Sequence, residues 1–146
     1  MPNRVSKVRL ELHMKVLQPE GWDAPKGYSN GISVEGPGRT LYIAGQIAWN
    51  AAQEIVGGES FSQQFEQALS NVTAVVAAGG GKPEHIVRLT VYVLDTQPYN
   101  KELKEIGAAY RDLIGKHYPA MSLVRVAGLL EPGALLEIEA TAFVPA

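Results

Sequence analysis

The feature that most restricts the fold of this chain is its C-terminal segment, residues 118–142, which reads as two apolar strands separated by a Glu131-Pro132-Gly133 turn. The second strand carries Glu137 and Glu139 within an otherwise apolar run. Because side chains alternate along a strand, both carboxylates lie on one face. Carboxylates rarely enter a buried strand unless they are paired or used. We therefore predict a terminal β-hairpin that ends at Pro145, with a second strand whose carboxylates are either paired with other groups or used in function.

The two glutamates allow two interpretations. In the first, Glu137 and Glu139 form ion pairs with Arg88 or Arg125 on neighbouring strands. In the second, a carboxylate faces a cleft at an interface and holds and activates a water molecule. The residues alone leave both interpretations open.

Composition places the chain among soluble globular proteins. It has 146 residues, the size of one domain, with 46% hydrophobic and 19% charged residues and a net charge of −2. It has no cysteine, which excludes disulfides, cysteine nucleophiles and thiolate metal sites. The N-terminal residues lack an apolar segment of signal-peptide length, and no apolar run approaches the ~18 residues of a membrane span. We expect a cytoplasmic protein that does not bind membranes.

Residue periodicity predicts alternating strands and helices. The predicted strands before the terminal hairpin cover residues 7–17, 28–35, 41–48 and 86–94. A first helix is predicted to start after Ser60, and a second to cover about 98–117. This order indicates a two-layer α+β domain with helices on one sheet face. The strand at 41–48 has few polar residues, so we expect both of its faces to be covered. The sheet face without helices should be an oligomer interface.

The two predicted helices have clear apolar faces. Ser60 and Gln63 form a capping box at the start of the first helix, and glycines 79–81 end it. Its predicted buried face comprises Phe61, Phe65, Ala68, Leu69, Val72, Val75 and Val76. The second helix should turn Leu103, Ile106, Tyr110 and Leu113 toward the sheet.

Several other motifs lack functional support. Gly79-Gly-Gly-Lys-Pro83 follows a helix and has proline after the lysine, so it reads as a helix C-cap and not as a phosphate loop. The histidines at 13, 85 and 117 show no metal-ligand spacing, and we expect neither a metal nor a cofactor. The sequon at 71–73 lies within a predicted helix. Basic residues do not cluster, which disfavours nucleic-acid binding.

Five sets of segments, in order along the chain, resemble the RidA/YjgF/YER057c/UK114 family, and the last of them lies in the C-terminal segment described above. The similarity extends from about Tyr28 to Phe143 and covers most of what we expect to be a single domain over residues 1–146, with residues 1–20 as an extension that adds a strand. The matching segments are Tyr28 with its neighbours, Tyr42-Ile-Ala-Gly-Gln-Ile-Ala48, Gln67-Ala-Leu-Ser-Asn-Val72, Thr90-Val-Tyr-Val-Leu-Asp95, and Pro119-Ala with Glu137-Ile-Glu-Ala140.

The resemblance implies a chorismate-mutase-like α+β protomer, with a mixed sheet and two helices on one face. It also implies a homotrimer with clefts between neighbouring subunits. Members of the family hydrolyse reactive enamines and imines without a cofactor. Their clefts combine a substrate-binding arginine, a tyrosine, backbone groups of a strand, and a glutamate linked to the attacking water.

Carried over residue by residue, the resemblance makes Glu137 the catalytic glutamate. It assigns substrate binding to the following residues of this chain: Tyr28, Ala44, Gly45, Gly107, Met121, Ser122 and Leu123. Met121 stands where the family has its arginine, and Gly107 replaces an asparagine. A thioether cannot make the charge-assisted bonds that hold a carboxylate, so Met121 favours a larger or less charged ligand.

Two functional hypotheses follow. The first is a cofactor-free hydrolytic deaminase of enamines or imines with an atypical substrate preference, in which Glu137 holds the water. The second is a non-catalytic trimer whose cleft binds a small metabolite. A third possibility, an endoribonuclease, is disfavoured by the acidic net charge and the lack of a basic patch.

Overall fold

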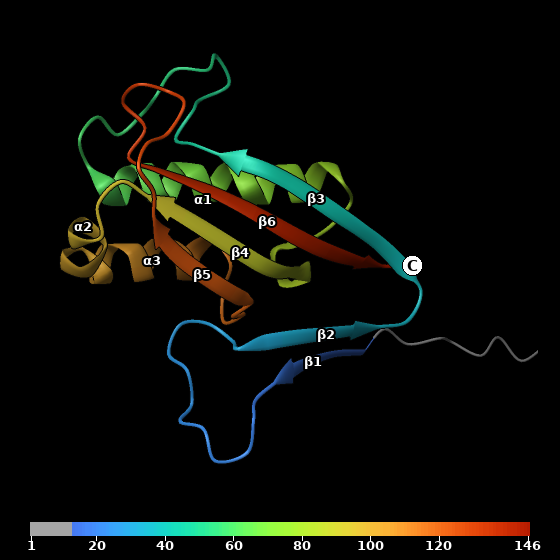
Figure 1. Ribbon diagram of the computed structural model, residues 1–146. Coiled ribbons are helices and arrows are strands. Elements are labelled where there is room, and N and C mark those ends of the chain that lie inside the picture. Colours follow the sequence, from blue (N-terminus) through green and yellow to red (C-terminus); the bar gives the residue numbers. More distant parts are fainter. Residues whose placement is uncertain (1–12) are drawn as a thin grey trace, which may run out of the picture.

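A computed structural model describes residues 13–146, which form a four-stranded sheet with helices on one face and a separate two-stranded ribbon (Figure 1). The order of strands in the main sheet is β3-β6-β4-β5. Its strands are β3 (Gly38–Gln46), β4 (Ile86–Val93), β5 (Ala120–Arg125) and β6 (Leu136–Pro145). The helices are α1 (Phe61–Ala78), η1 (Pro83–His85), α2 (Gln97–Lys101) and α3 (Leu103–Leu113). This mixed α+β architecture is the predicted fold class.

The predicted terminal hairpin is wrong. A turn does form, with the Ala134 amide donating to the Glu131 carbonyl, but β5 and β6 are not neighbours. Strand β4 lies between them, parallel to β5 and antiparallel to β6. The physical reason is that β4 can pair on both edges and is buried by the helices, whereas β5 has more exposed residues and takes the edge.

Strand β6 lies at the centre of the sheet and shows the clearest alternation. Leu136, Ile138 and Ala140 are buried, whereas Glu137 and Glu139 are half-buried on the opposite face, as predicted. The buried residues join the core formed with α1, α3 and β4. The helices therefore cover one face of β6, and the glutamates project from the other.

The ribbon consists of β1 (His13–Leu17) and β2 (Gly31–Glu35), paired antiparallel and set apart from the main sheet (Figure 1). Residues 7–12 of the first predicted strand lie outside the described residues. The predicted strand over 28–35 forms only from Gly31, and Tyr28 precedes it in a loop. The predicted strand over 41–48 is shifted to Gly38–Gln46.

Three helical predictions need correction. The helix expected over about 98–117 is two helices, α2 and α3, and α3 ends at Leu113 before Gly115 adopts a φ of 82°. Leu103 is 52% exposed and Val75 is 41% exposed, so neither belongs to the core. The predicted capping box of α1 forms only in half. Ser60 Oγ accepts a hydrogen bond from the Gln63 amide at 3.3 Å, but the Ser60 amide donates to the Gly57 carbonyl and not to the Gln63 side chain.

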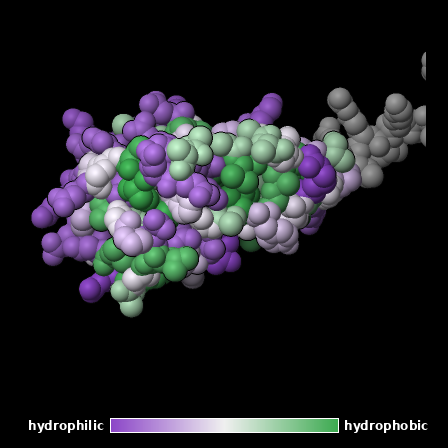
Figure 2. Space-filling model, turned by 90° about the horizontal axis from the view of Figure 1, so that it is seen from above, coloured by the Kyte–Doolittle hydropathy of each residue, from purple (hydrophilic) through white to green (hydrophobic). Residues whose placement is uncertain are grey.

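Strand β3 is also more exposed than predicted. Tyr42 is 83% exposed, and Ile43 is the buried residue of the strand. One face of β3 is therefore open in the protomer. The view in Figure 2 shows hydrophobic and hydrophilic residues interspersed over the face that it displays. None of the described helices is both long enough and apolar enough for a bilayer span.

Candidate functional site

Glu137 lies directly against the backbone of Gly45. A Cβ atom placed on Gly45 would collide with the Glu137 carboxylate, so only glycine leaves room for it. The pairing of β3 with β6 is irregular between Ile43 and Gln46, which places a bulge at Ala44 and Gly45. Bulges interrupt the hydrogen-bond ladder and change the direction of nearby groups. The family resemblance assigned Ala44, Gly45 and Glu137 to one site; the structure places Gly45 against Glu137, and Ala44 precedes Gly45 in the bulge.

Gln64 fixes the start of the strand that carries Glu137. This fully buried side chain on α1 donates hydrogen bonds to the carbonyls of Gly58 and Gly133, at 2.7 and 2.9 Å. Its oxygen accepts one from the Leu135 amide at 2.9 Å. Because a buried amide is costly to leave unpaired, this set of bonds holds the loop before β6 on α1.

Two other side chains of α1 fix the segment after the bulge. Asn71 Nδ2 donates to the carbonyls of Ile47 and Trp49, at 3.0 and 2.9 Å. Gln67 Nε2 donates to the same Trp49 carbonyl and to Asn71 Oδ1. The Gln-x-Leu-x-Asn segment therefore has a structural role, since it anchors the chain that follows Gly45. The asparagine of the apparent sequon is part of this network.

Glu139 does not form the ion pair considered in the sequence analysis. It accepts a hydrogen bond from the Tyr92 hydroxyl at 2.6 Å, and Arg125 Nε donates to the Leu94 carbonyl. Within the described residues, no Lys or Arg nitrogen lies within 4.0 Å of a carboxylate oxygen. The hydrogen bond to Glu139 is the main cause that raises the pKa of Tyr92 above 10.0. Glu139 is thus engaged by a neighbouring side chain, whereas Glu137 faces Gly45.

Met121 lies on the other face of the sheet. It pairs in register with Leu89 on β4 and packs against the core beneath the helices. It lines a cleft of about 300 Å³ between the edge strand β5, helices α2 and α3, and the loop before Tyr28. We call this the Met121 cleft. Its lining residues are Lys26, Gly27, Phe65, Val91, Tyr99, Leu103, Ile106, Gly107, Tyr110, Arg111, Tyr118 and Met121.

Aromatic side chains dominate the walls of the Met121 cleft. The rings of Tyr110 and Tyr118 stack with centroids 5.8 Å apart, and Tyr99 meets Phe61 edge to face at 6.4 Å. Burial raises the pKa of Tyr110 strongly, with a further contribution from Tyr118, and burial also raises the pKa of Tyr99. Tyr99 and Tyr110 therefore stay neutral at physiological pH and present an apolar surface to the cleft.

The other predicted substrate-binding residues lie around β5. Gly107 lines the Met121 cleft, and Tyr28 and Ser122 line an adjoining cavity that also includes Met121. Ser29 holds Tyr28 near this edge, because its amide donates to the Pro119 carbonyl at 3.1 Å. Leu123 faces the core and lines neither cavity.

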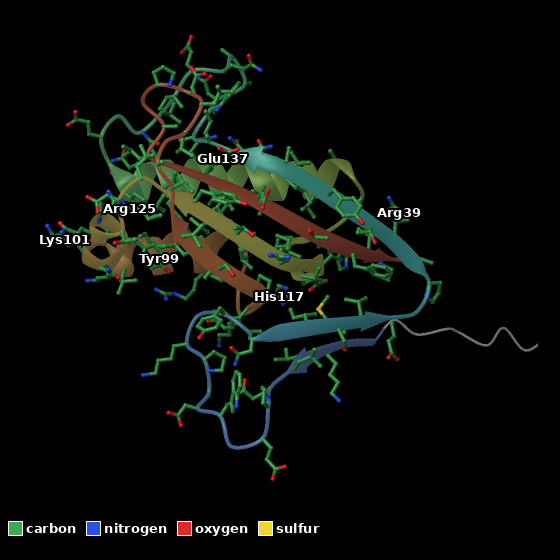
Figure 3. All side chains as sticks on the ribbon, viewed as in Figure 1. Arg39, Tyr99, Lys101, His117, Arg125 and Glu137 are labelled. Carbon is green, nitrogen blue, oxygen red and sulfur yellow. The ribbon has the colours of Figure 1, made fainter. Side chains whose placement is uncertain are left out.

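The predicted site residues thus form two groups that do not meet within one protomer. Glu137 pairs with Tyr92 on β4, whereas Met121 pairs with Leu89, three residues or about 10 Å away along the strand. The two side chains also project from opposite faces of the sheet. Figure 3 shows Glu137 near the end of β3, whereas Tyr99 belongs to α2 and lies near α3. One small molecule cannot contact both groups of the same chain.

Sequence analysis assigned only Gly107 and Met121 to a ligand site and so missed the charged residues and tyrosines of the cleft, which are Lys26, Tyr99, Tyr110, Arg111 and Tyr118. Tyr110 was assigned to packing, and the others were not singled out. Arg111 was detectable, because it lies four residues after Gly107 and shares its helix face. For metals, the described residues contain no group of three or more His, Asp or Glu side chains placed to hold an ion.

Comparison with known proteins identifies the relatives of this chain. Residues 21–144 match the sequence model of the family Endoribonuclease L-PSP. The human 2-iminobutanoate/2-iminopropanoate deaminase is 29% identical over 79% of this chain and 78% of its own length. A Lactococcus lactis protein named as a regulator, AldR, is 30% identical over 82% of this chain and 91% of its own.

A solved structure agrees with this grouping. The crystal structure of YyfB from Yersinia pestis, described as a protein of unknown function of the conserved Rid protein family, has a TM-score of 0.75. It is 38% identical and covers 88% of this chain and 97% of its own. Sequence and fold therefore place this chain in the Endoribonuclease L-PSP family, which is the RidA/YjgF/YER057c/UK114 family that its segments resemble.

Proposed function

We propose that this protein hydrolyses the C=N bond of enamine or imine compounds and releases ammonia. The observation that carries this proposal is the contact between Gly45 and the Glu137 carboxylate at a bulge in β3. The human relative at 29% identity is named as a deaminase of small imino acids, which supports the reaction class.

The reaction needs one positioned carboxylate. An enamine first tautomerises to its imine, and the protonated imine has an electrophilic carbon. Glu137 accepts a hydrogen bond from a water molecule and takes its proton as the oxygen attacks that carbon. The resulting carbinolamine has one hydroxyl and one amino group on the same carbon. Glu137 then returns the proton to nitrogen and the C–N bond breaks, while the hydroxyl proton passes to the departing ammonia. The products are a ketone and an ammonium ion, and the carboxylate is restored.

The complete site requires a second copy of the chain in this proposal. Glu137 and Met121 lie on opposite faces of the sheet, so the Glu137 group of one copy would face the Met121 cleft of another. The exposed face of β3, including Tyr42, is available for such contacts. We propose a homotrimer, which light scattering would report as about three times the 15.7 kDa chain.

The decisive experiment measures ammonia release from 2-iminopropanoate, generated in situ, by the wild type and Glu137→Gln. We expect Glu137→Gln to lower the rate by roughly 10²–10⁴-fold, the usual contribution of a general base. Glu139→Gln is the matched control, since it lies on the same strand face but is bonded to Tyr92. Equal rates for the wild type and Glu137→Gln would show that the role of Glu137 is wrong.

A second candidate is a non-catalytic trimer that binds a small metabolite. The apolar Met121 favours it, since the arginine expected from the family is missing. The relative named as a regulator, AldR, also fits this possibility. The same experiment separates the two, because a binding protein would show no Glu137-dependent turnover but would still bind a ligand in the Met121 cleft.

A further inference from the structure

The Met121 cleft carries positive charge at a position that the family resemblance does not assign. Lys26 and Arg111 are the two charged residues among its twelve lining residues, and both are exposed to solvent. No acidic residue lines the cleft. Within the described residues, Arg111 has no carboxylate partner within 4.0 Å. Its guanidinium is therefore available for an anion.

Gly107 leaves space for this guanidinium. Arg111 follows Gly107 by one helical turn, and a Cβ atom placed on Gly107 would lie 3.3 Å from Arg111 Nη1. Glycine within a helix is less favourable than alanine, so its presence here calls for a local reason. A Cβ atom at position 107 would require the guanidinium to move by a few tenths of an ångström, and a larger side chain would compete with it for the same space.

The remaining lining is apolar and aromatic. Tyr99, Tyr110, Tyr118 and Met121 form walls around a volume of about 300 Å³, within the range of small-molecule sites. The Tyr110 hydroxyl already donates to the His117 carbonyl, so this ring offers the ligand mainly its apolar surface. Aromatic rings pack well against such walls, and Met121 adapts to irregular shapes. A small imino acid would leave much of this surface in contact with water.

We propose that Arg111 replaces the missing arginine as the carboxylate-binding residue and that the Met121 cleft selects carboxylates with an aromatic or similarly bulky apolar group. This inference rests on the proposed function only in treating the cleft as the substrate site. The guanidinium holds the carboxylate through two parallel N–H···O bonds. The tyrosines and Met121 hold the apolar group.

Three probe ligands test this inference by binding alone. 3-Phenylpropanoate has both features, propanoate lacks the ring, and 3-phenylpropanamide lacks the charge. We expect 3-phenylpropanoate to bind the wild type at least about tenfold more tightly than either of the others, the size of one charge-assisted or apolar contribution. Isothermal titration calorimetry measures the three dissociation constants.

The binding site is located by NMR of the methionine methyl groups. The chain has three methionines, and Met121 lines the cleft. With 13C-methyl methionine, addition of 3-phenylpropanoate should shift the Met121 signal, which Met121→Leu assigns. Binding that leaves the Met121 signal in place would overturn the inference, since the ligand would lie elsewhere.

Variants of α3 test whether Arg111 binds the carboxylate. Arg111→Gln should weaken 3-phenylpropanoate binding by about tenfold or more, and Gly107→Asn should also weaken it by crowding the guanidinium. Lys104→Gln removes an exposed charge of the same helix outside the cleft and should change affinity by less than about twofold. All three positions are partly or fully exposed, and thermal melts verify folding.

Failure of this inference can be told from failure of the proposed function. If Arg111→Gln binds as well as the wild type, or if the amide binds as well as the acid, the role of Arg111 is wrong. Glu137-dependent ammonia release would be unaffected by that result. Conversely, Arg111-dependent binding without Glu137-dependent turnover would leave the inference intact and reject catalysis.

Discussion

The region around Glu137 and the Met121 cleft differ in how far they keep the pattern of the family. At Glu137, the glycine that the carboxylate needs is present, and side-chain amides of α1 hold both flanking segments in place. In the Met121 cleft, Met121 and Gly107 stand where the family resemblance implies an arginine and an asparagine. Under the proposed function, this difference means that the groups for activating water follow the family pattern, whereas the groups for recognising the ligand depart from it.

Gly45→Ala should have the largest effect among variants that test this comparison. The added methyl group would displace the Glu137 carboxylate, and a shift of about 1 Å at a reacting group can cost roughly 10²-fold in rate. Steady-state ammonia release measures the effect. Gly128→Ala is a matched control, because a Cβ there meets no atom within 4 Å. Wild-type activity in Gly45→Ala would mean that the observed carboxylate position is not the active one.

Met121→Arg should have a smaller effect, confined to recognition. A guanidinium at this position can bind the carboxylate of a small 2-oxo acid, and we expect about tenfold tighter binding of 2-oxobutanoate. Calorimetry of the wild type, Met121→Arg and the volume-conserving control Met121→Leu measures this change. An unchanged affinity in Met121→Arg would count against Met121 as part of the ligand site.

Tyr110→Phe should have the smallest effect and should change stability rather than chemistry. Burial raises the pKa of Tyr110 above the usual 10.0, so its stabilising contribution is complete below pH 10 and is lost as pH rises above it. The phenylalanine variant should lose about 1 kcal/mol at neutral pH, because the hydrogen bond to the His117 carbonyl is removed. Its stability should then fall less steeply between pH 10 and 11 than that of the wild type.

Urea denaturation at pH 7, 10 and 11 gives these free energies of unfolding. Tyr118→Phe serves as the control, since Tyr118 is 38% exposed. Some alkaline dependence should remain, because the pKa of Tyr99 is also raised by burial. If the free energy of unfolding falls equally between pH 10 and 11 in Tyr110→Phe and in the wild type, the alkaline loss of stability does not come from the buried Tyr110 hydroxyl.

Local sequence patterns predicted much of the fold. The period of apolar residues placed α1, and the period of two placed Glu137 and Glu139 on one strand face. The Ser60 cap and the family segments around Gly45 were also recognisable, and the predicted α+β class is correct. These features depend on residues that are neighbours along one helix or one strand, so spacing alone carries the information.

Pairing between distant segments was less predictable. Two consecutive strands with a turn between them look like a hairpin, yet β4 separates β5 from β6. The sequence contains no local mark of this insertion, because it depends on which strand edges bury the most surface against α1 and α3. The position of Leu103 was also unpredictable from local pattern. Its helical spacing predicted a side chain that faces the sheet, but it is exposed and lines the Met121 cleft.

By itself, the sequence determined the types of element, the shared face of the two glutamates and the thioether at position 121, where the family resemblance implies an arginine. Only the tertiary structure decided that Glu137 and Met121 lie on opposite faces of the sheet and that Arg111 and three tyrosines surround Met121. The physical reason is that side-chain alternation fixes a residue's face only relative to its own strand. Which face meets the helices is set by the packing of the whole sheet.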